Sequence, residues 1–435
     1  MSSTAIAASV VQPRPRSIVG TICRRVLLAL VCLLLATLVA SEGYLGEGRK
    51  TLVINQAIGP RGFAFGAWEV QALGQKARDL IAQPAADLSP QAQHDLVIAY
   101  FDAIAEIGRL NGEIERIYAN PKETNPAAAA AGLAARLEAL RNDQARRRPA
   151  VEATLETQTA AILREAGLTT LNRMWPPVRF QFTESPHKLI VSPRRRIAVE
   201  GEALLQPTVP LDQIEGIESA VETALDVSAL VEGTGGISSY PTMIVEIASL
   251  EWVLSTIAHE WMHTYMIFYP LGLRYFENRD TRTLNETVAS IVGDEIGRLA
   301  LERFYPELAP PPPPPRPARG VTPTPAPGPP RFQFGPFMRE TRLTVDKLLA
   351  EGQVIEAEEY MEARRQVLVA NGYAIRKLNQ AYFAFHGSYA VGPAGTDPIG
   401  DKLRALRQRA LSLADFVRIV ARITSVAELD AALAR

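Results

Sequence analysis

The amino-acid sequence predicts an α+β protein that is mostly helical. Residues 89–168 have the apolar periodicity of long helices, and short alternating segments typical of strands begin near residue 178. Two further helical segments follow, one with the pattern His-Glu-x-x-His and one with a glutamate near its start. We therefore expect a small mixed sheet over the His-Glu-x-x-His helix and the glutamate helix, preceded by a long helical pair.

The composition is that of a globular protein. The chain has 435 residues, of which 47% are hydrophobic, and this length is sufficient for two or three domains. Its formal net charge of -1 gives no electrostatic reason to expect nucleic-acid binding. Both cysteines, Cys23 and Cys32, lie near the N-terminus, so the remainder of the chain has no disulfide.

The N-terminal segment predicts attachment to a membrane. Val26–Ala40 is an apolar run that arginines precede and no acidic residue precedes. We expect 1–21 to be a cytoplasmic tail and 22–41 a transmembrane anchor, in a single-pass cell-membrane protein with the bulk of its chain extracytoplasmic. The alternative is a signal peptide whose cleavage gives a secreted chain, although Leu38 is a poor residue for such a cleavage site.

The next region predicts a helical spacer domain over residues 45–175. Ser89-Pro90 is a typical helix start, and apolar side chains then follow at spacings of three and four up to Tyr118. Asn120-Pro121 ends this helix, and a second helical stretch covers residues 127–168. The pair either holds the remainder of the chain away from the membrane or binds a partner as a coiled coil.

The remainder, residues 176–435, predicts a zinc peptidase-like domain that a proline-rich loop at 309–331 interrupts. The loop is expected to contribute no chemistry. The strand expected at 243–247 directly precedes the His-Glu-x-x-His helix, and it is either a substrate-binding edge strand or an ordinary strand of the sheet. The expected strands are 178–182, 188–191, 196–200 and 243–247, and the expected helices are 212–225, 249–269, 284–304, several between 337 and 385, 412–419 and 425–432.

His259-Glu260-Trp261-Met262-His263 is the motif that carries the chemistry. Residues four apart lie on one face of a helix, so His259 and His263 can bind one metal ion with Glu260 beside it. Zinc lowers the pKa of a bound water to about 7, and an adjacent carboxylate can accept its proton during attack on a peptide carbonyl. The alternative is an amphipathic helix with two solvated histidines, against which the uncharged flanks of the motif argue.

A catalytic zinc usually has three protein ligands and a water. The metzincin pattern would place glycine and histidine where Met266 and Tyr269 stand, so a third histidine of that kind is excluded. A glutamate on the following helix remains, either Glu286 or Glu295. These two are nine residues apart, about 900° at 100° per residue, and so face opposite sides of a helix. We favour Glu286, which shares its face with small residues that allow close approach; Asp294 and Glu295 are expected to be solvated or to support the ligands.

These motifs resemble the HExxH…NExxAxxVG arrangement of gluzincin-type zinc metallopeptidases. The matching segments are His259–His263 and Asn285–Gly293, and the resemblance is closest to bacterial envelope-attached predicted aminopeptidases. Leu378–Tyr382 and Tyr389 resemble the C-terminal region of that group, and the resemblance covers residues 240–310 and 370–420. It implies a zincin-like fold and a single Zn²⁺ held by His259, His263 and Glu286, with Glu260 as base.

The oxyanion of the tetrahedral intermediate also needs a donor, for which tyrosine or histidine is suitable. Tyr382, His386 and Tyr389 are the candidates, because their spacings of four and three place them on one helix face. The alternative is that they are packing or surface residues of a late helix. His94 and His187 have no metal-like neighbours and are expected to be structural or exposed.

The sequence thus predicts a membrane-anchored extracytoplasmic zinc metallopeptidase that acts on a peptide or protein substrate. The alternative is a zinc-stabilised, catalytically inactive scaffold or binding protein of the cell envelope. Whether such an enzyme is an aminopeptidase or an endopeptidase depends on an anionic group that holds the substrate α-amine. Glu246 is the candidate for that group, by its place on the strand before the motif.

Overall fold

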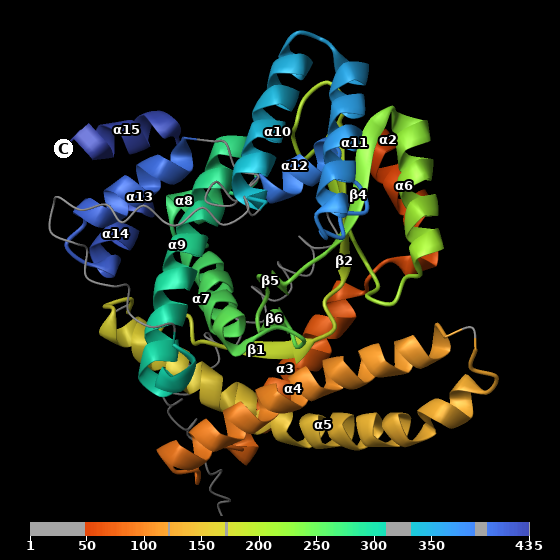
Figure 1. The fold of residues 1–435 in the computed structure, drawn as a ribbon. Helices are drawn as coiled ribbons and strands as arrows, with labels where there is room; N and C mark the ends of the chain where they lie inside the picture. Colours follow the sequence, from red (N-terminus) through yellow and green to blue (C-terminus); the bar gives the residue numbers. More distant parts are fainter. Residues whose placement is uncertain (1–47, 121, 170–172, 310–331, 388–397, 435) are drawn as a thin grey trace, which may run out of the picture. The chain divides into compact units, whose positions relative to one another are not determined.

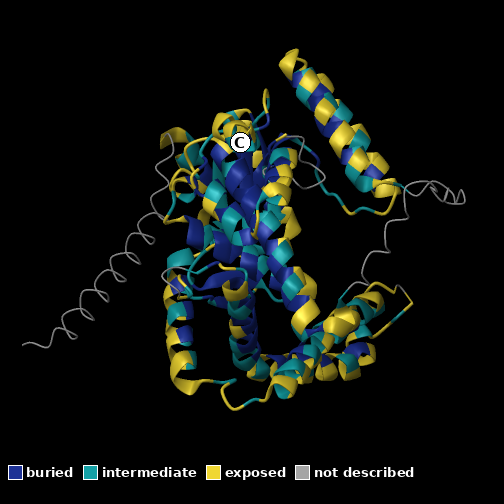
Figure 2. Cartoon of the chain, turned by 90° about the vertical axis from the view of Figure 1, so that its left-hand side faces the viewer, coloured by how far each residue is buried: buried dark blue, intermediate teal, exposed yellow. Residues whose placement is uncertain are grey.

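Helices make up most of the fold, and its strands form two small sheets (Figure 1). The computed structural model describes residues 48–120, 122–169, 173–309, 332–387 and 398–434. Contacts divide the chain after Thr51, and everything below concerns the unit Leu52–Arg435. The prediction of a mostly helical α+β protein with a small mixed sheet is confirmed. Buried residues gather on the inner faces of the helices and exposed residues on their outer faces (Figure 2).

The predicted helical pair consists of α4 (Pro90–Tyr118) and α5 (Pro126–Glu165), which pack against each other. Ser89 caps α4 by accepting a hydrogen bond from the backbone N–H of Ala92, and Asn125 caps α5 in the same way. The second half of α5 is buried, and its apolar side chains join the same hydrophobic core as the His-Glu-x-x-His helix. This core therefore crosses the domain boundary expected at residue 175. Two shorter helices precede the pair: α2 (Gly48–Ile58) and α3 (Phe65–Ala82).

The first sheet is mixed and has the strand order β1-β6-β5. Its middle strand, β6 (Thr242–Val245), pairs in parallel with β1 (Phe180–Thr183) and antiparallel with β5 (Gly236–Ile237). The strand expected at 243–247 is therefore an inner strand, and the edge-strand alternative for it is wrong. The two edges of the sheet are formed by β5 and β1.

The outer edge of β1 is closed by carboxylates from α5. Glu152 accepts a hydrogen bond from the N–H of Phe182 at 2.7 Å, and Glu156 accepts one from the N–H of Phe180 at 3.1 Å. Lys76 on α3 lies between the two carboxylates, with its Nζ 2.7 Å and 2.9 Å from their nearest oxygens. All three side chains are buried, and each charged group has an oppositely charged partner, which buried charges require.

The second sheet is antiparallel, with the order β3-β2-β4, and the sequence did not predict it as a separate layer. Side chains alternate between its faces, so the residues of β2 contribute to two different clusters. One face packs on α6 and the other on α10, α11 and α12. The bounds of these elements are β2 (His187–Pro193), β3 (Gly201–Leu205), β4 (Val227–Gly233), α6 (Leu211–Leu225), α10 (Phe334–Ala350), α11 (Val354–Ala370) and α12 (Gln380–His386).

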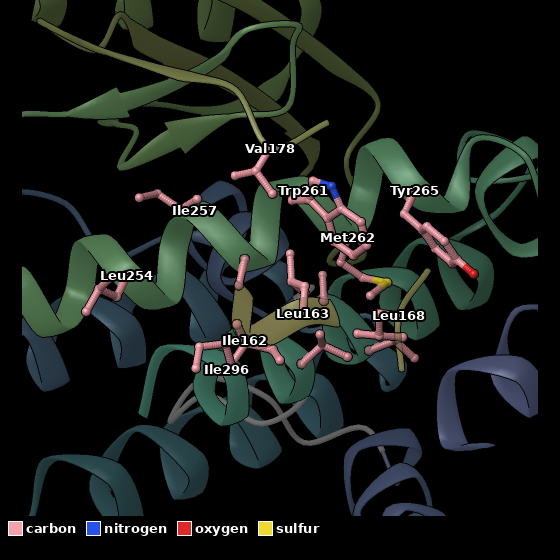
Figure 3. Packing of buried hydrophobic residues seen from close by; sticks show 14 of the residues in the cluster. Ile162, Leu163, Leu168, Val178, Leu254, Ile257, Trp261, Met262, Tyr265 and Ile296 are labelled. Carbon is pink, nitrogen blue, oxygen red and sulfur yellow. The ribbon is translucent and has the colours of Figure 1, made fainter. Parts of the chain in front are cut away.

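The largest core surrounds α7 (Leu250–Met266), the helix that carries the His-Glu-x-x-His motif. Figure 3 shows Leu254, Ile257, Trp261 and Met262 packed with apolar residues of α5 and with Ile296 of α9. The glutamate helix is α9 (Arg279–Phe304), and α8 (Pro270–Leu273) lies between the two. The C-terminal helices, of which α13 and α14 pack on α9, are α13 (Ile399–Arg409), α14 (Leu413–Val420) and α15 (Val426–Ala434).

Two glycines of α9 allow it to lie against α7. A Cβ added at Gly293 would stand 2.8 Å from the carbonyl oxygen of Ser255 and 2.9 Å from the Cβ of His259. A Cβ at Gly297 would stand 2.7 Å from the Cα of Ser255. No real side chain fits at these distances, so the two helix backbones touch, and α9 holds its own residues close to the motif.

The expectation of a membrane anchor is corrected. None of the helices in the part of the chain that the structure describes is both long and apolar enough to cross a membrane. This finding overturns the predicted transmembrane helix and the predicted cell-membrane location. The tail 1–21 and the segment 22–41, on which that expectation and its cleaved-signal alternative were based, lie outside the described residues, as does the proline-rich loop after Ala309.

The helix contact gives a test of the fold. We expect Gly293→Ala to lower the free energy of unfolding by about 1–3 kcal/mol, because α7 and α9 must move apart to admit the methyl group. Urea denaturation of the full chain, followed by circular dichroism, measures this change. Gly108→Ala is the matched control: nothing lies within 4 Å of its added Cβ, and alanine is expected to be neutral or stabilising in α4. Equal destabilisation by both variants would contradict a special role for the helix contact.

Candidate metal centre

The side chains of His259, His263 and Glu286 meet at one point between α7 and α9. One ligand atom from each lies within 4.8 Å of the others. The two Nε2 atoms are 3.1 Å apart, and Glu286 Oε2 is 3.6 Å from that of His259 and 3.5 Å from that of His263. Tetrahedral ligands bound at about 2.1 Å are separated by about 3.4 Å, so these spacings match those of three ligands around one zinc ion.

The polar atoms at this point also have the character of metal ligands. Glu286 Oε2 is buried and has no hydrogen-bond partner among the described residues. Burial by itself would raise the pKa of Glu286, but the neighbouring histidines hold it well below its usual value. Burial likewise disfavours the charged form of His263, yet the carboxylate of Glu286 raises its pKa to about 9. The site therefore favours positive charge between these groups, and two imidazoles with one carboxylate form a donor set that suits zinc.

Two residues that the sequence did not predict orient the ligands. His263 donates from Nδ1 to Asn285 Oδ1 at 2.6 Å, which assigns the proton to Nδ1 and directs the Nε2 lone pair toward His259 and Glu286. The amide of Asn285 donates in turn to the carbonyl of Leu271. Tyr275, between α8 and α9, donates from its hydroxyl to Glu286 Oε1. Asn285 could have been noticed as the neighbour of Glu286, whereas no periodicity marks Tyr275.

Glu260 lies beside the three residues and beneath β5. Its side chain is buried, and burial raises its pKa although both motif histidines oppose this. A Cβ added at Gly236 would stand 3.0 Å from Glu260 Oε1, a tight contact, so β5 passes close to the carboxylate. The backbone carbonyl of Glu260 accepts a hydrogen bond from Ser238 at 3.3 Å. The edge strand and the carboxylate are thus direct neighbours.

The rival carboxylates have other partners. Glu295 forms a two-pronged ion pair with Arg407 of α13, at 2.9 Å and 2.7 Å. Asp294 accepts a hydrogen bond from Ser255 at 3.0 Å. The structure therefore places Glu286 with the motif histidines and Glu295 at a helix contact, as their separation along α9 predicts.

Of the candidate oxyanion donors, His386 does not belong to the metal-ligand cluster. Tyr382 and His386 lie on α12, which packs on the second sheet, and their ring centroids are 4.2 Å apart. Burial lowers the pKa of His386 to about 4, so its ring is neutral, and its Nε2 has no hydrogen-bond partner among the described residues. Tyr389 lies outside the described residues. Their assignment as donors stays a prediction.

The remaining histidines have the structural surroundings that the sequence predicts. His94 lies between Asp95 and Glu307, with ring nitrogens 2.9 Å and 2.8 Å from their oxygens. These carboxylates raise the pKa of His94, mainly by hydrogen bonding. His187 approaches the carbonyl of Gln206 at 3.3 Å. Neither histidine belongs to the metal-ligand cluster.

Glu246, directly after β6, has its carboxylate bound by residues of the helical pair. Its carboxylate accepts two hydrogen bonds from Arg148 of α5, at 2.9 Å and 2.7 Å, and a third from the hydroxyl of Tyr100 of α4. These contacts join the helical pair to the end of β6. They leave Glu246 poorly suited to hold the α-amine of a substrate.

No family model, curated protein or solved structure matches the chain in these comparisons. The geometry of the residues themselves therefore carries the functional interpretation.

The identity of the third ligand can be tested with a matched pair of variants. We expect Glu286→Gln to weaken Zn²⁺ binding at least about 100-fold, because the neutral amide removes the anionic ligand from the site. Glu295→Gln, nine residues along the same helix, should keep the affinity, since Glu295 contacts Arg407 instead. Competition with a chromophoric chelator measures both affinities. Retained binding in Glu286→Gln, or equal loss in both variants, would reject Glu286 as the ligand.

Proposed function

We propose that this protein is a zinc metallopeptidase of the gluzincin type, with the zincin-like arrangement of an HExxH helix and a glutamate helix. The observation that carries the proposal is the convergence of His259, His263 and Glu286 with a buried Glu260 directly beside them. A site that only stabilised the fold would need the three ligands and would have no use for a second carboxylate, that of Glu260. The resemblance of the two motifs to gluzincins points in the same direction.

In this proposal His259, His263 and Glu286 hold Zn²⁺, which when bound supplies Lewis acidity that polarises a carbonyl and makes a water acidic. Glu260 then acts as the general base, accepting the proton of the attacking water, and afterwards returns the proton to the leaving amine. Its burial supports this role, because a carboxylate with a raised pKa is a better proton acceptor than an ordinary one.

The position of β5 supports a peptide as the substrate. An edge strand can bind an extended peptide by adding it to the sheet, with backbone hydrogen bonds that do not depend on the side chains of the peptide. β5 is such an edge strand, and Gly236 within it lies against Glu260. A peptide paired with β5 would thus have its backbone next to the proposed general base.

The general base gives the decisive test. We expect Glu260→Gln to keep bound Zn²⁺ and to lower the rate of peptide hydrolysis by about 10²–10⁴-fold, because the amide cannot accept the proton. Mass spectrometry of a digested peptide library measures hydrolysis, and atomic absorption measures the zinc. Glu251→Gln is the control, since Glu251 is an exposed glutamate in the first turn of the same helix.

The outcomes separate the two functions that the sequence left open. Hydrolysis that survives Glu260→Gln would remove this carboxylate from the mechanism. A wild-type protein that binds zinc, loses stability on chelation and cuts no peptide would instead be a zinc-stabilised scaffold.

The same peptide library distinguishes an endopeptidase from an aminopeptidase. The engagement of Glu246 by Arg148 and Tyr100 favours internal cleavage over removal of N-terminal residues. We therefore expect acetylation of the peptide N-terminus to leave the cleavage rate unchanged. Loss of cleavage on acetylation would identify an aminopeptidase and would require another anionic group for the α-amine.

A further inference from the structure

We propose that Tyr275 is a positioning residue of the metal centre: it holds one oxygen of Glu286 so that the other oxygen alone serves as ligand. This inference rests on the proposed zinc site and adds to it a group that contacts a ligand and not the reacting atoms. It also connects the centre to the second sheet, through Arg282 and Glu202.

The two oxygens of the Glu286 carboxylate have different surroundings. Oε1 accepts the hydroxyl hydrogen of Tyr275, while Oε2 lies 3.6 Å and 3.5 Å from the two Nε2 atoms and has no hydrogen-bond partner among the described residues. A carboxylate with both oxygens available can rotate or bind a metal through both. The phenol removes this freedom, because rotation would break its hydrogen bond.

The ring of Tyr275 is held by Arg282. Arg282 and Glu286 are four residues apart on α9 and therefore lie on the same face of the helix. The guanidinium carbon of Arg282 is 5.2 Å from the centroid of the Tyr275 ring, within the range of a cation–π contact. The ring thus contacts the Arg282 side chain while its hydroxyl reaches Glu286, one helical turn further along.

Arg282 is itself held by an ion pair with Glu202. Its two terminal nitrogens lie 3.3 Å and 3.2 Å from the two oxygens of Glu202 on β3, and Lys188 on β2 lies 3.8 Å from Glu202. Burial would raise the pKa of Glu202, but the two cations hold it below its usual value, so this carboxylate is charged. An ion pair anchored on the second sheet therefore sets the position of the ring.

The direction of the Tyr275 hydrogen bond distinguishes a positioning role of this phenol from a direct role in catalysis. A phenol that stabilised an oxyanion would have to direct its proton toward the substrate. The hydroxyl of Tyr275 instead donates its one hydrogen bond to Glu286. Its role is thus expected in the affinity and coordination of the metal, before any substrate is present.

The test uses the full chain and the metal alone. We expect Tyr275→Phe to weaken Zn²⁺ binding about 10–100-fold, as measured by competition with a chromophoric chelator, since it removes only the orienting hydrogen bond. Tyr269→Phe is the matched control. The hydroxyl of Tyr269 bonds that of Tyr265 at 2.8 Å, away from the ligands, so its removal should leave the affinity unchanged.

Cobalt provides a second readout that a purely structural role would not change. With Co²⁺ in place of Zn²⁺, we expect Tyr275→Phe to lower the visible absorption per metal, because a carboxylate that binds through both oxygens raises the coordination number. Arg282→Gln is expected to weaken Zn²⁺ binding by about 2–5-fold, the low end of what a cation–π contact contributes. This variant keeps the inference testable even if Tyr275→Phe folds poorly.

The outcomes separate this inference from the proposed function. If the wild-type chain binds zinc and cleaves peptides while Tyr275→Phe has the same zinc affinity and cobalt spectrum, the positioning role is rejected and the peptidase stands. If Tyr275→Phe keeps its affinity and spectrum but loses turnover, the phenol acts on the substrate, which also overturns the positioning role. A wild-type chain that binds no zinc would reject both proposals.

Discussion

The contact between α7 and α9 is the constraint on which the candidate site depends. Two ligands lie on α7 and the third on α9, so the ligand atoms can meet only if the two backbones approach closely. Gly293 and Gly297 permit this approach where they face Ser255 and His259. Around this line of contact the helices are buried by α5 and the C-terminal helices, which hold them together from outside. The glycines are therefore as much a part of the site as its ligands, although they contact no metal.

Placing three ionisable ligands and Glu260 in a core is costly unless each polar atom has a partner. Two of the ligands, His263 and Glu286, are supported from their far sides. Asn285 accepts a hydrogen bond from Nδ1 of His263, and Tyr275 donates one to Oε1 of Glu286, so that the remaining atoms face one another. Two imidazole nitrogens and a carboxylate oxygen brought this close are most stable with a cation between them. These three atoms are therefore arranged as the ligands of a bound cation would be.

Local periodicity explains both what the sequence predicts and what it misses. The spacing of His259 and His263 follows from the helical repeat. The choice of Glu286 over Glu295 follows from the repeat together with the small residues on the face of Glu286, and the structure agrees with both. Tyr275 lies between helices, where no repeat applies, and it reaches Glu286 only through the path of the chain after α8. The strand at 243–247 was recognised as a strand, but its place inside the sheet depends on β1 and β5, which are distant or very short. The pairing of Glu246 with Arg148 likewise joins residues 98 positions apart. Contacts of this kind are set by the fold as a whole, and no pattern within one segment reports them.

The two edges of the first sheet have different surroundings. One of them is closed by the helical pair, which is more than a spacer would do. At β1 the outward backbone N–H groups of Phe180 and Phe182 are taken by Glu156 and Glu152, and Lys76 balances the two carboxylates. That edge cannot accept another strand, because its donors are occupied. At the opposite edge β5 lies directly over Glu260, and its Gly236 brings the backbone against the carboxylate. In the proposed peptidase, an extended peptide would therefore add to this sheet at β5, beside the proposed general base, and not at β1. In the proposed peptidase, α5 would thus leave β5 as the edge for strand addition, and its buried half shares a core with α7.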